Sequence, residues 1–355
     1  VLSALFVVAY TFLGGFLAES ASDFIQGVVR IFALVTVLGA GVFVAGGLSE
    51  VLSNLGEIPG FLDFFGVATP ETDADGVQRL STAGSPIFGA AGGYGALTII
   101  STLSWGLGYF GMPQVLLRFV AIRKVNELRR SRRIAVIWVL ISLFAAVAIG
   151  LVGRAVYPDA FLTAGGAENI FIHTAGALLP PLLAGVVMAG ILAATMSSSD
   201  SYLLIASSAV SRNLYKGIFK KDATDRQVMT AGRITLVLVS LVGILIALDE
   251  DSVIFTIVSF AWAGFGATFG PLMLFTLFWK RTTRAGAIAG ILAGGGMVFF
   301  WKLVIRPLGG VLNIYELLPA FAFSALAIVV FSLATKAPGR EIVEEFEMAR
   351  THEAV

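Results

Sequence analysis

Residues 178–211, LLPPLLAGVVMAGILAATMSSSDSYLLIASSAVS, decide the class of this chain. The stretch is longer than the roughly 20 residues that an α-helix needs to cross about 30 Å of hydrocarbon. Its single charged residue is Asp200, and hydroxyl side chains supply its other polar groups. The pattern predicts a membrane-spanning helix with a polar patch beyond its midpoint.

The composition of all 355 residues points the same way, with 57% hydrophobic residues, 13% charged residues and a mean hydropathy of +0.90. A soluble domain carries roughly a quarter charged residues. The net charge of +1 argues against nucleic acid as a partner, because phosphate neutralisation needs clustered basic charge. The absence of cysteine excludes disulfides, thiolate metal sites and cysteine nucleophiles.

Similar apolar runs recur along the chain, and nine of them are candidate spans. They cover approximately 1–17, 24–48, 91–120, 134–157, 178–211, 233–248, 253–279, 285–305 and 314–335. The run that ends at Leu248 is short unless it begins before Arg233. We therefore predict an all-α integral membrane protein of about nine helices, with a transmembrane domain over 1–335 and a short tail over 336–355.

Basic residues gather on alternate connections between these runs, as the positive-inside rule requires of the cytoplasmic side. They are Arg123, Lys124, Arg129, Arg130, Arg132 and Arg133, then Arg212, Lys216, Lys220, Lys221 and Arg226, then Lys280, Arg281 and Arg284, and finally Lys336 and Arg340. The opposite connections are mainly acidic. We expect a multi-pass protein of the inner (plasma) membrane with a cytoplasmic C-terminus.

The chain opens at Val1 inside an apolar run, without an initiator Met, a basic n-region or a small-residue cleavage site. These features are not those of a signal peptide. Because an odd number of spans that begins inside a helix is an unusual natural start, we expect a chain that lacks its N-terminal part.

The polar patch of 178–211 has helical spacing. Ala194, Ser197 and Ser198 share one helix face, and Ser197, Asp200 and Ser201 form a second, overlapping group. Oxygen ligands of this kind replace the hydration shell of a hard monovalent cation. The alternative is that the serines bond to carbonyls one turn back or allow helices to pack closely. A carboxylate inside a span costs roughly 2.5 to 3.5 kcal/mol unless it is compensated, so Asp200 favours the cation site.

A second acidic candidate, Asp23, lies in the polar segment Glu19–Asp23, which we interpret as a break between the first two spans. From its position alone, a solvated loop charge or a helix N-cap explains Asp23 as well as a functional role does.

Aromatic and glycine residues interrupt the run 91–120 with the sequence SWGLGYFGMP at 104–113. The G-x-G-x-x-G within it is no dinucleotide motif, because a membrane span provides no βαβ unit. Trp105 and Tyr109 are four residues apart, so their rings can flank one small apolar ligand. Pro113 lacks an N–H donor and leaves a carbonyl group free. Ordinary aromatic packing explains the cluster equally well.

Four stretches, at 10–18, 104–113, 191–201 and 262–271, together resemble the sodium/solute symporter family, and in particular its bacterial members that transport proline. The resemblance runs from Tyr10 to about Pro338. It implies a five-plus-five inverted-repeat (LeuT-like) transporter fold with alternating access. It also implies that these nine spans are the last nine of thirteen, and that the missing four supply further sodium and substrate ligands.

Carried onto this sequence, the family pattern implies a sodium site at the Ala194 carbonyl and the Ser197 and Ser198 hydroxyls. The pattern also implies a second sodium position or release path, formed by Asp23, Asp200 and Ser201 with Ser197. It implies a proline site at Trp105, Tyr109 and Pro113. The sequence departs from that pattern at Met112, where glutamine is expected, and at Asp200, where serine is expected.

The resemblance therefore implies sodium-coupled uptake of L-proline, with Na+ as the co-transported ion, the lipid bilayer as surroundings, no nucleic acid partner and no enzyme activity. Other small amino acids or osmolytes, and a proton in place of sodium, stay open as alternatives. A transporter-like membrane sensor is a further alternative, although the tail after Thr335 is too short for a folded signalling domain. A sodium channel is a third alternative. It is disfavoured because broken, glycine-rich helices suit a carrier better than a continuous pore.

Overall fold

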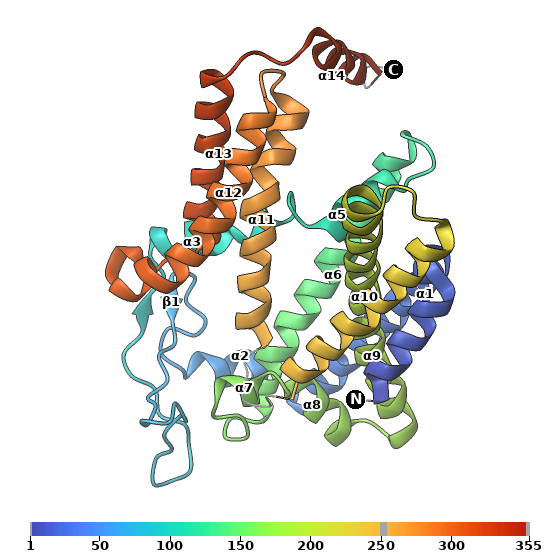
Figure 1. Ribbon diagram of the computed structural model, residues 1–355. Helices are drawn as coiled ribbons and strands as arrows, with labels where there is room; N and C mark the ends of the chain where they lie inside the picture. The colour runs from blue at the N-terminus through green and yellow to red at the C-terminus, as the bar shows by residue number, and fades with distance from the viewer. Residues whose placement is uncertain (1, 249–253, 353–355) are drawn as a thin grey trace. The chain divides into compact units, whose positions relative to one another are not determined.

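The computed structural model describes residues 2–248 and 254–352, most of which are helical, with a long non-helical segment over 57–95 (Figure 1). The chain forms two compact units. The first unit comprises Val1–Gly93 and Lys124–Ser252, and the second comprises Tyr94–Arg123 and Val253–Val355.

The first unit is built around four long helices. Its elements are α1 (Leu2–Val44), α2 (Leu48–Gly56), α6 (Glu127–Val156), α7 (Ala164–Ala167), α8 (Ile170–Leu178), α9 (Pro181–Ser208), the wider π-helical turns η1 (Ala209–Phe219) and α10 (Asp225–Ile246). Strands β1 (Gly66–Val67) and β2 (Gly92–Gly93) pair antiparallel at the base of a long hairpin. This hairpin is anchored to α6, because Arg154 donates a hydrogen bond of 3.0 Å to the side-chain oxygen of Gln78.

The second unit consists of three long helices with short ones beside them. Its elements are α3 (Ala96–Leu103), α4 (Trp105–Gly108), α5 (Pro113–Val120), α11 (Ile254–Phe278), α12 (Arg284–Phe300), η2 (Trp301–Ile305), η3 (Arg306–Leu308), η4 (Gly310–Leu312), α13 (Leu317–Ala334) and α14 (Arg340–His352). Its core joins α11, α12 and α13 through Trp262, Val298 and Leu317, together with Met112, the residue before α5.

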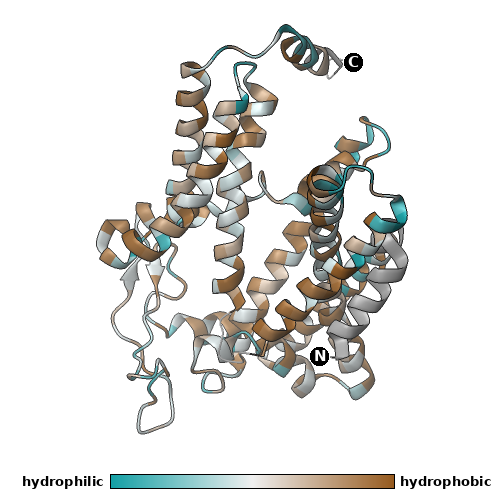
Figure 2. Ribbon diagram, viewed as in Figure 1, coloured by the Kyte–Doolittle hydropathy of each residue, from teal (hydrophilic) through white to brown (hydrophobic). Residues whose placement is uncertain are grey.

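Seven helices of the described residues are long and apolar enough to cross a membrane. They are Ser20–Val44, Glu127–Val156, Pro181–Phe219, Asp225–Ile246, Ile254–Phe278, Arg284–Leu308 and Leu317–Ala334. Each corresponds to one of the nine predicted runs, whereas the count of nine is not confirmed. Figure 2 shows hydrophobic residues along these helices, while hydrophilic residues gather in the connections and on α14.

The predicted break between the first two spans is wrong. Residues 2–44 form one continuous helix, α1, which runs through Glu19–Asp23. This segment contains neither glycine nor proline, and its polar side chains do not interrupt backbone hydrogen bonds between residues four apart. Asp23 therefore lies within a helix and is neither a loop residue nor an N-cap.

The predicted interruption of 91–120 is confirmed, because this run divides into α3, α4 and α5. Met112 adopts an extended conformation (φ −78°, ψ 116°), as the residue before a proline prefers, and Pro113 begins α5. The run that ends near Leu248 does begin before Arg233. Thr224 and Gln227 form a capping box that starts α10 at Asp225.

Candidate cation and substrate sites

The serine-rich stretch lies on α9, and its hydroxyl groups bond to backbone oxygens of the preceding turn. Ser197 and Ser198 both donate to the carbonyl oxygen of Ala194, at 3.0 and 3.3 Å. Ser199 donates instead to Thr195 at 2.8 Å, away from this pair. The hydroxyl protons of Ser197 and Ser198 therefore point at the backbone. Each hydroxyl oxygen therefore keeps lone pairs that can accept a hydrogen bond or ligate a cation.

The second group of the stretch points into the first unit. Asp200 is 0% exposed, and its Oδ1 accepts a hydrogen bond of 2.8 Å from the backbone N–H of Ser201. The Ser201 hydroxyl donates to the carbonyl oxygen of Ser197 at 3.1 Å. A carboxylate and two hydroxyl groups thus lie within one turn of α9, an oxygen set that suits Na+.

An arginine of α1 reaches this stretch. Arg30 donates from Nη2 to the Oγ of Ser197 at 2.7 Å, and its guanidinium lies 5.3 Å from the centre of the Trp138 ring. Asp23 is seven residues before Arg30 on α1 and is half-buried. Seven residues are close to two helical turns, so both charges lie on the same face of α1. The structure therefore associates α1 with the predicted second cation position.

Sequence reasoning missed Arg30, although the signal was present. A charged residue inside the apolar run 24–48 needs a partner in the interior of the protein, just as Asp200 does in 178–211.

The aromatic segment lies in the second unit, and its rings pack together. The ring of Trp105 stacks on that of Trp262 with centroids 5.4 Å apart and on that of Tyr315 with centroids 5.8 Å apart. Tyr109 meets Trp262 edge to face at 4.8 Å. Trp105 is therefore largely committed to packing, whereas Tyr109, which is 48% exposed, has a free ring face.

The glycines of the segment allow this packing. A Cβ atom on Gly108 would collide with the indole of Trp262, and one on Gly111 would collide with the backbone of α11 at Phe265. A Cβ on Gly106 would meet nothing within 4 Å. The α4 segment is thus held against α11 along the face that carries Gly108 and Gly111. Pro113 is half-buried at the start of α5, and the structure brings it into none of these ring contacts.

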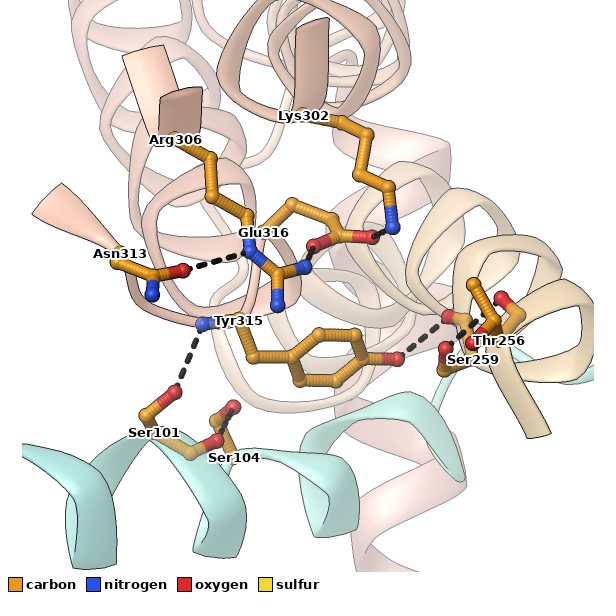
Figure 3. Close-up of polar contacts among 9 residues, drawn as sticks. All are labelled: Ser101, Ser104, Thr256, Ser259, Lys302, Arg306, Asn313, Tyr315 and Glu316. Carbon is orange, nitrogen blue, oxygen red and sulfur yellow. Dashed lines mark hydrogen bonds and ion pairs between the residues drawn. The ribbon is translucent and has the colours of Figure 1, made fainter. Parts of the chain in front are cut away.

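Tyr315, which stacks on Trp105, is itself held by two hydrogen bonds (Figure 3). Its backbone N–H donates to the Ser101 hydroxyl at 2.7 Å, and its phenol donates to the carbonyl oxygen of Ser259 at 2.6 Å. Burial, together with the neighbouring Glu316 carboxylate, raises the pKa of Tyr315 above its ordinary value. The phenol therefore stays protonated and remains a donor. One residue ties α3, α11 and the start of α13 together.

The next residue, Glu316, is 0% exposed and lies between two cations (Figure 3). Its Oε2 is 2.8 Å from Nη1 of Arg306, and its Oε1 is 3.4 Å from Nζ of Lys302. Nε of Arg306 also donates to Asn313 at 3.1 Å. These contacts hold the turn before α13, and with it the backbone of Tyr315, against η2 and η3, which follow α12. The sequence analysis did not identify this cluster, although its charges lie within or next to predicted spans.

Comparison with known proteins finds relatives that match nearly the whole chain. A family model described as the sodium:solute symporter family matches residues 1–294. The high-affinity proline transporter PutP of Bacillus subtilis is 37% identical over 96% of this chain and 66% of its own length. The sodium/proline symporter of Salmonella typhimurium is 37% identical over 97% of this chain and 64% of its own length. That of Escherichia coli is 36% identical over the same shares. The chain thus spans about 64–66% of the length of these relatives.

One solved structure shares the fold across 95% of this chain and 66% of its own, with a TM-score of 0.69 and 20% identity. It is the substrate-bound, outward-open state of a Na+-coupled sialic acid symporter. At this identity the likeness concerns the fold alone.

Proposed function

The chain belongs to the sodium:solute symporter family, and on this basis we propose that it takes part in the sodium-coupled symport of L-proline into the cell. The observation that carries the proposal is the similarity of nearly the whole chain to relatives named for proline transport. That similarity spans both the serine-rich helix and the aromatic segment. Transport of this kind makes no covalent bond, so the protein is no enzyme.

Sodium binds in this proposal at the Ala194 carbonyl and the hydroxyls of Ser197 and Ser198. Support comes from the two hydroxyl groups, which donate to the backbone and so keep oxygen lone pairs as potential ligands, one of which accepts from Arg30 at Ser197. Asp23, Asp200 and Ser201 form a second position or the release path, supported by the burial of Asp200.

Proline binds beside Trp105, Tyr109 and Pro113. Tyr109 offers an exposed ring face to the apolar pyrrolidine, and Trp105 sets the position of the segment by its stacking. Because coupling between two ligands is reciprocal, bound sodium raises the affinity for proline by the same factor by which bound proline raises the affinity for sodium. Couplings of this kind are commonly about 1 to 3 kcal/mol.

The protein lies in the plasma membrane with its C-terminus in the cytoplasm, and its helices belong to a five-plus-five inverted-repeat fold. The support for this orientation is the gathering of lysine and arginine on alternate connections. In this topology residues 1–335 form the transporter domain and 336–355 a cytoplasmic tail.

Uptake into proteoliposomes tests the proposal. With an inward sodium gradient, labelled proline should accumulate more than labelled glycine, pantothenate or glucose, and replacing sodium with potassium should abolish the difference. Equal uptake of pantothenate or glucose contradicts the substrate. Accumulation driven by a proton gradient alone contradicts the coupling ion.

A further inference from the structure

Arg30 and Ser197 are linked by the packing of two antiparallel helices, α1 and α9. A Cβ atom on Gly190 of α9 would lie 2.7 Å from the Cβ of Ala33, so the helices approach closely there. Val37 and Val187 belong to the core cluster on one side of this crossing. On the other side, α9 reaches Ser197 seven residues after Gly190.

The reach of the arginine side chain completes this geometry. Ser197 lies about 10 Å along α9 from Gly190, at a rise of roughly 1.5 Å per residue. Arg30 lies about 4.5 Å from Ala33 in the same direction. Helical side chains point back towards the N-terminus of their helix, and the Arg30 side chain spans the remaining distance to Ser197. Asp23 lies ten residues before Ala33 on α1, and Asp200 lies ten residues after Gly190 on α9. The two carboxylates are therefore at about the same height along the facing helices.

The guanidinium is held by few groups. It has the Ser197 hydroxyl at 2.7 Å, the face of Trp138 at 5.3 Å and the electrostatic attraction of Asp23. Its buried Nε has no hydrogen-bond acceptor among the described residues. Buried arginines usually satisfy more of their five N–H groups, so this one can leave its position at modest cost.

Arg30 also uses the oxygen that sodium needs. The proton of Ser197 is directed at the Ala194 carbonyl oxygen, so Arg30 takes up a lone pair of the hydroxyl. A sodium ion at Ser197 and Ser198 would share that oxygen with a guanidinium a few ångströms away. Two positive charges at that distance repel, because water and salt screen a partly buried pair less than an exposed one.

We propose that Arg30 is an internal competitor of the co-transported cation, which occupies Ser197 when sodium is absent and is displaced when sodium binds. The inference rests on the proposed sodium coupling. In this proposal Arg30 sets the affinity of the site for sodium, and its guanidinium occupies Ser197 when no sodium is bound. The guanidinium swings towards Asp23 on displacement, so the charge inside the span stays compensated.

The test measures sodium binding to purified protein, both by the sodium concentration that half-saturates protection against thermal unfolding and by sodium-dependent proline uptake. Arg30→Met keeps the apolar length and removes the charge. It should lower the half-saturating sodium concentration about tenfold in both measurements, which corresponds to about 1.4 kcal/mol. The proline concentration for half-maximal uptake at saturating sodium should stay the same.

Arg154→Met is the matched control. Arg154 is another half-buried arginine of the first unit, bonded to Gln78 and lying 5.1 Å from the Phe88 ring, away from the serine-rich stretch. Its variant should bind sodium as the parent does. A double-mutant cycle adds specificity: in a Ser197→Ala background, Arg30→Met should bring no further gain. Arg30→Gln replaces Arg30→Met if the latter does not fold, because glutamine removes the charge and keeps a donor.

The inference is overturned if both Arg30 variants bind sodium no more tightly than a parent that does depend on sodium. That result leaves the proposed function intact. A gain that persists in the Ser197→Ala background also overturns the inference. A parent that neither binds sodium nor depends on it for uptake contradicts the proposed function instead.

Discussion

The indole nitrogen of Trp262 donates a hydrogen bond of 2.9 Å to the backbone carbonyl oxygen of Trp105. That oxygen is available because α4 is only four residues long and leaves carbonyl groups without helical donors. The stacked rings of the same two residues add dispersion to the hydrogen bond. The interruption of an apolar run thus supplies the contact that fixes the proposed substrate segment to α11.

Gly108→Ala should disturb this contact, because the new methyl group collides with the Trp262 indole. We expect a loss of about 1 to 3 kcal/mol in stability, as in other overpacked cores, and weaker proline binding. Thermal unfolding in detergent and proline uptake measure the two effects.

Gly106→Ala is the internal control for Gly108→Ala, since its methyl group meets nothing within 4 Å. Alanine favours helix over glycine by up to about 1 kcal/mol, so this variant should be as stable as the parent or slightly more so. Equal losses in the two variants would show that glycine flexibility, and not the approach of Trp262, is what the segment needs.

Tyr109→Ala should raise the proline concentration for half-maximal uptake more than it changes the dependence on sodium, because Tyr109 presents an exposed ring face. Trp105→Ala should have the same effect and should also lower stability, by about 3 to 5 kcal/mol for a packed tryptophan. Uptake is measured at varied proline and fixed sodium, and then at varied sodium and fixed proline. The two series separate the effect on proline from the effect on sodium. If neither variant alters proline dependence, both rings serve packing alone.

The sequence predicted the spans well because apolar length is a local property. Seven runs reappear as long helices, and Pro113 marks the start of α5 as its missing N–H requires. The prediction failed at Glu19–Asp23, where polarity was taken as a sign of a break. A helix breaks when its backbone hydrogen bonds are lost, and none of these five residues removes one.

Partners across the fold could not be predicted from spacing. The periodicity of α9 placed Ser197, Asp200 and Ser201 on one side of a helix, but it carried no information on which helix faces them. Arg30 is 167 residues from Ser197, and Tyr315 is 214 residues from Ser101. Such pairs depend on how helices pack, which a single sequence does not specify.

Glu316→Gln should destabilise the second unit, because it leaves Lys302 and Arg306 without their shared carboxylate. Breaking a buried ion pair costs about 3 to 5 kcal/mol, and the partial exposure of both cations places the loss at the lower end. Glu344→Gln is the control. Its pair with Arg340 is exposed, and exposed pairs one helical turn apart contribute only about 0.3 to 0.5 kcal/mol. Thermal unfolding that is equally affected by both variants would contradict the role of burial at Glu316.

The serine-rich stretch allows cation ligation to be separated from helix packing. Ser197→Ala and Ser198→Ala keep a small side chain, so α9 should pack nearly as before, yet each removes an oxygen from the proposed shell of the ion. The sodium concentration for half-maximal uptake should rise well before expression falls. Ser199→Ala is the control, because Ser199 bonds to Thr195 and not to the shared Ala194 carbonyl, and it should behave like the parent. Asp200→Asn keeps the shape of a fully buried side chain and removes its charge, so it should weaken the dependence on sodium if the second group holds a cation. Identical sodium dependence in all four variants would mean that the hydroxyl groups serve the helix alone, and the cation site would have to be sought elsewhere.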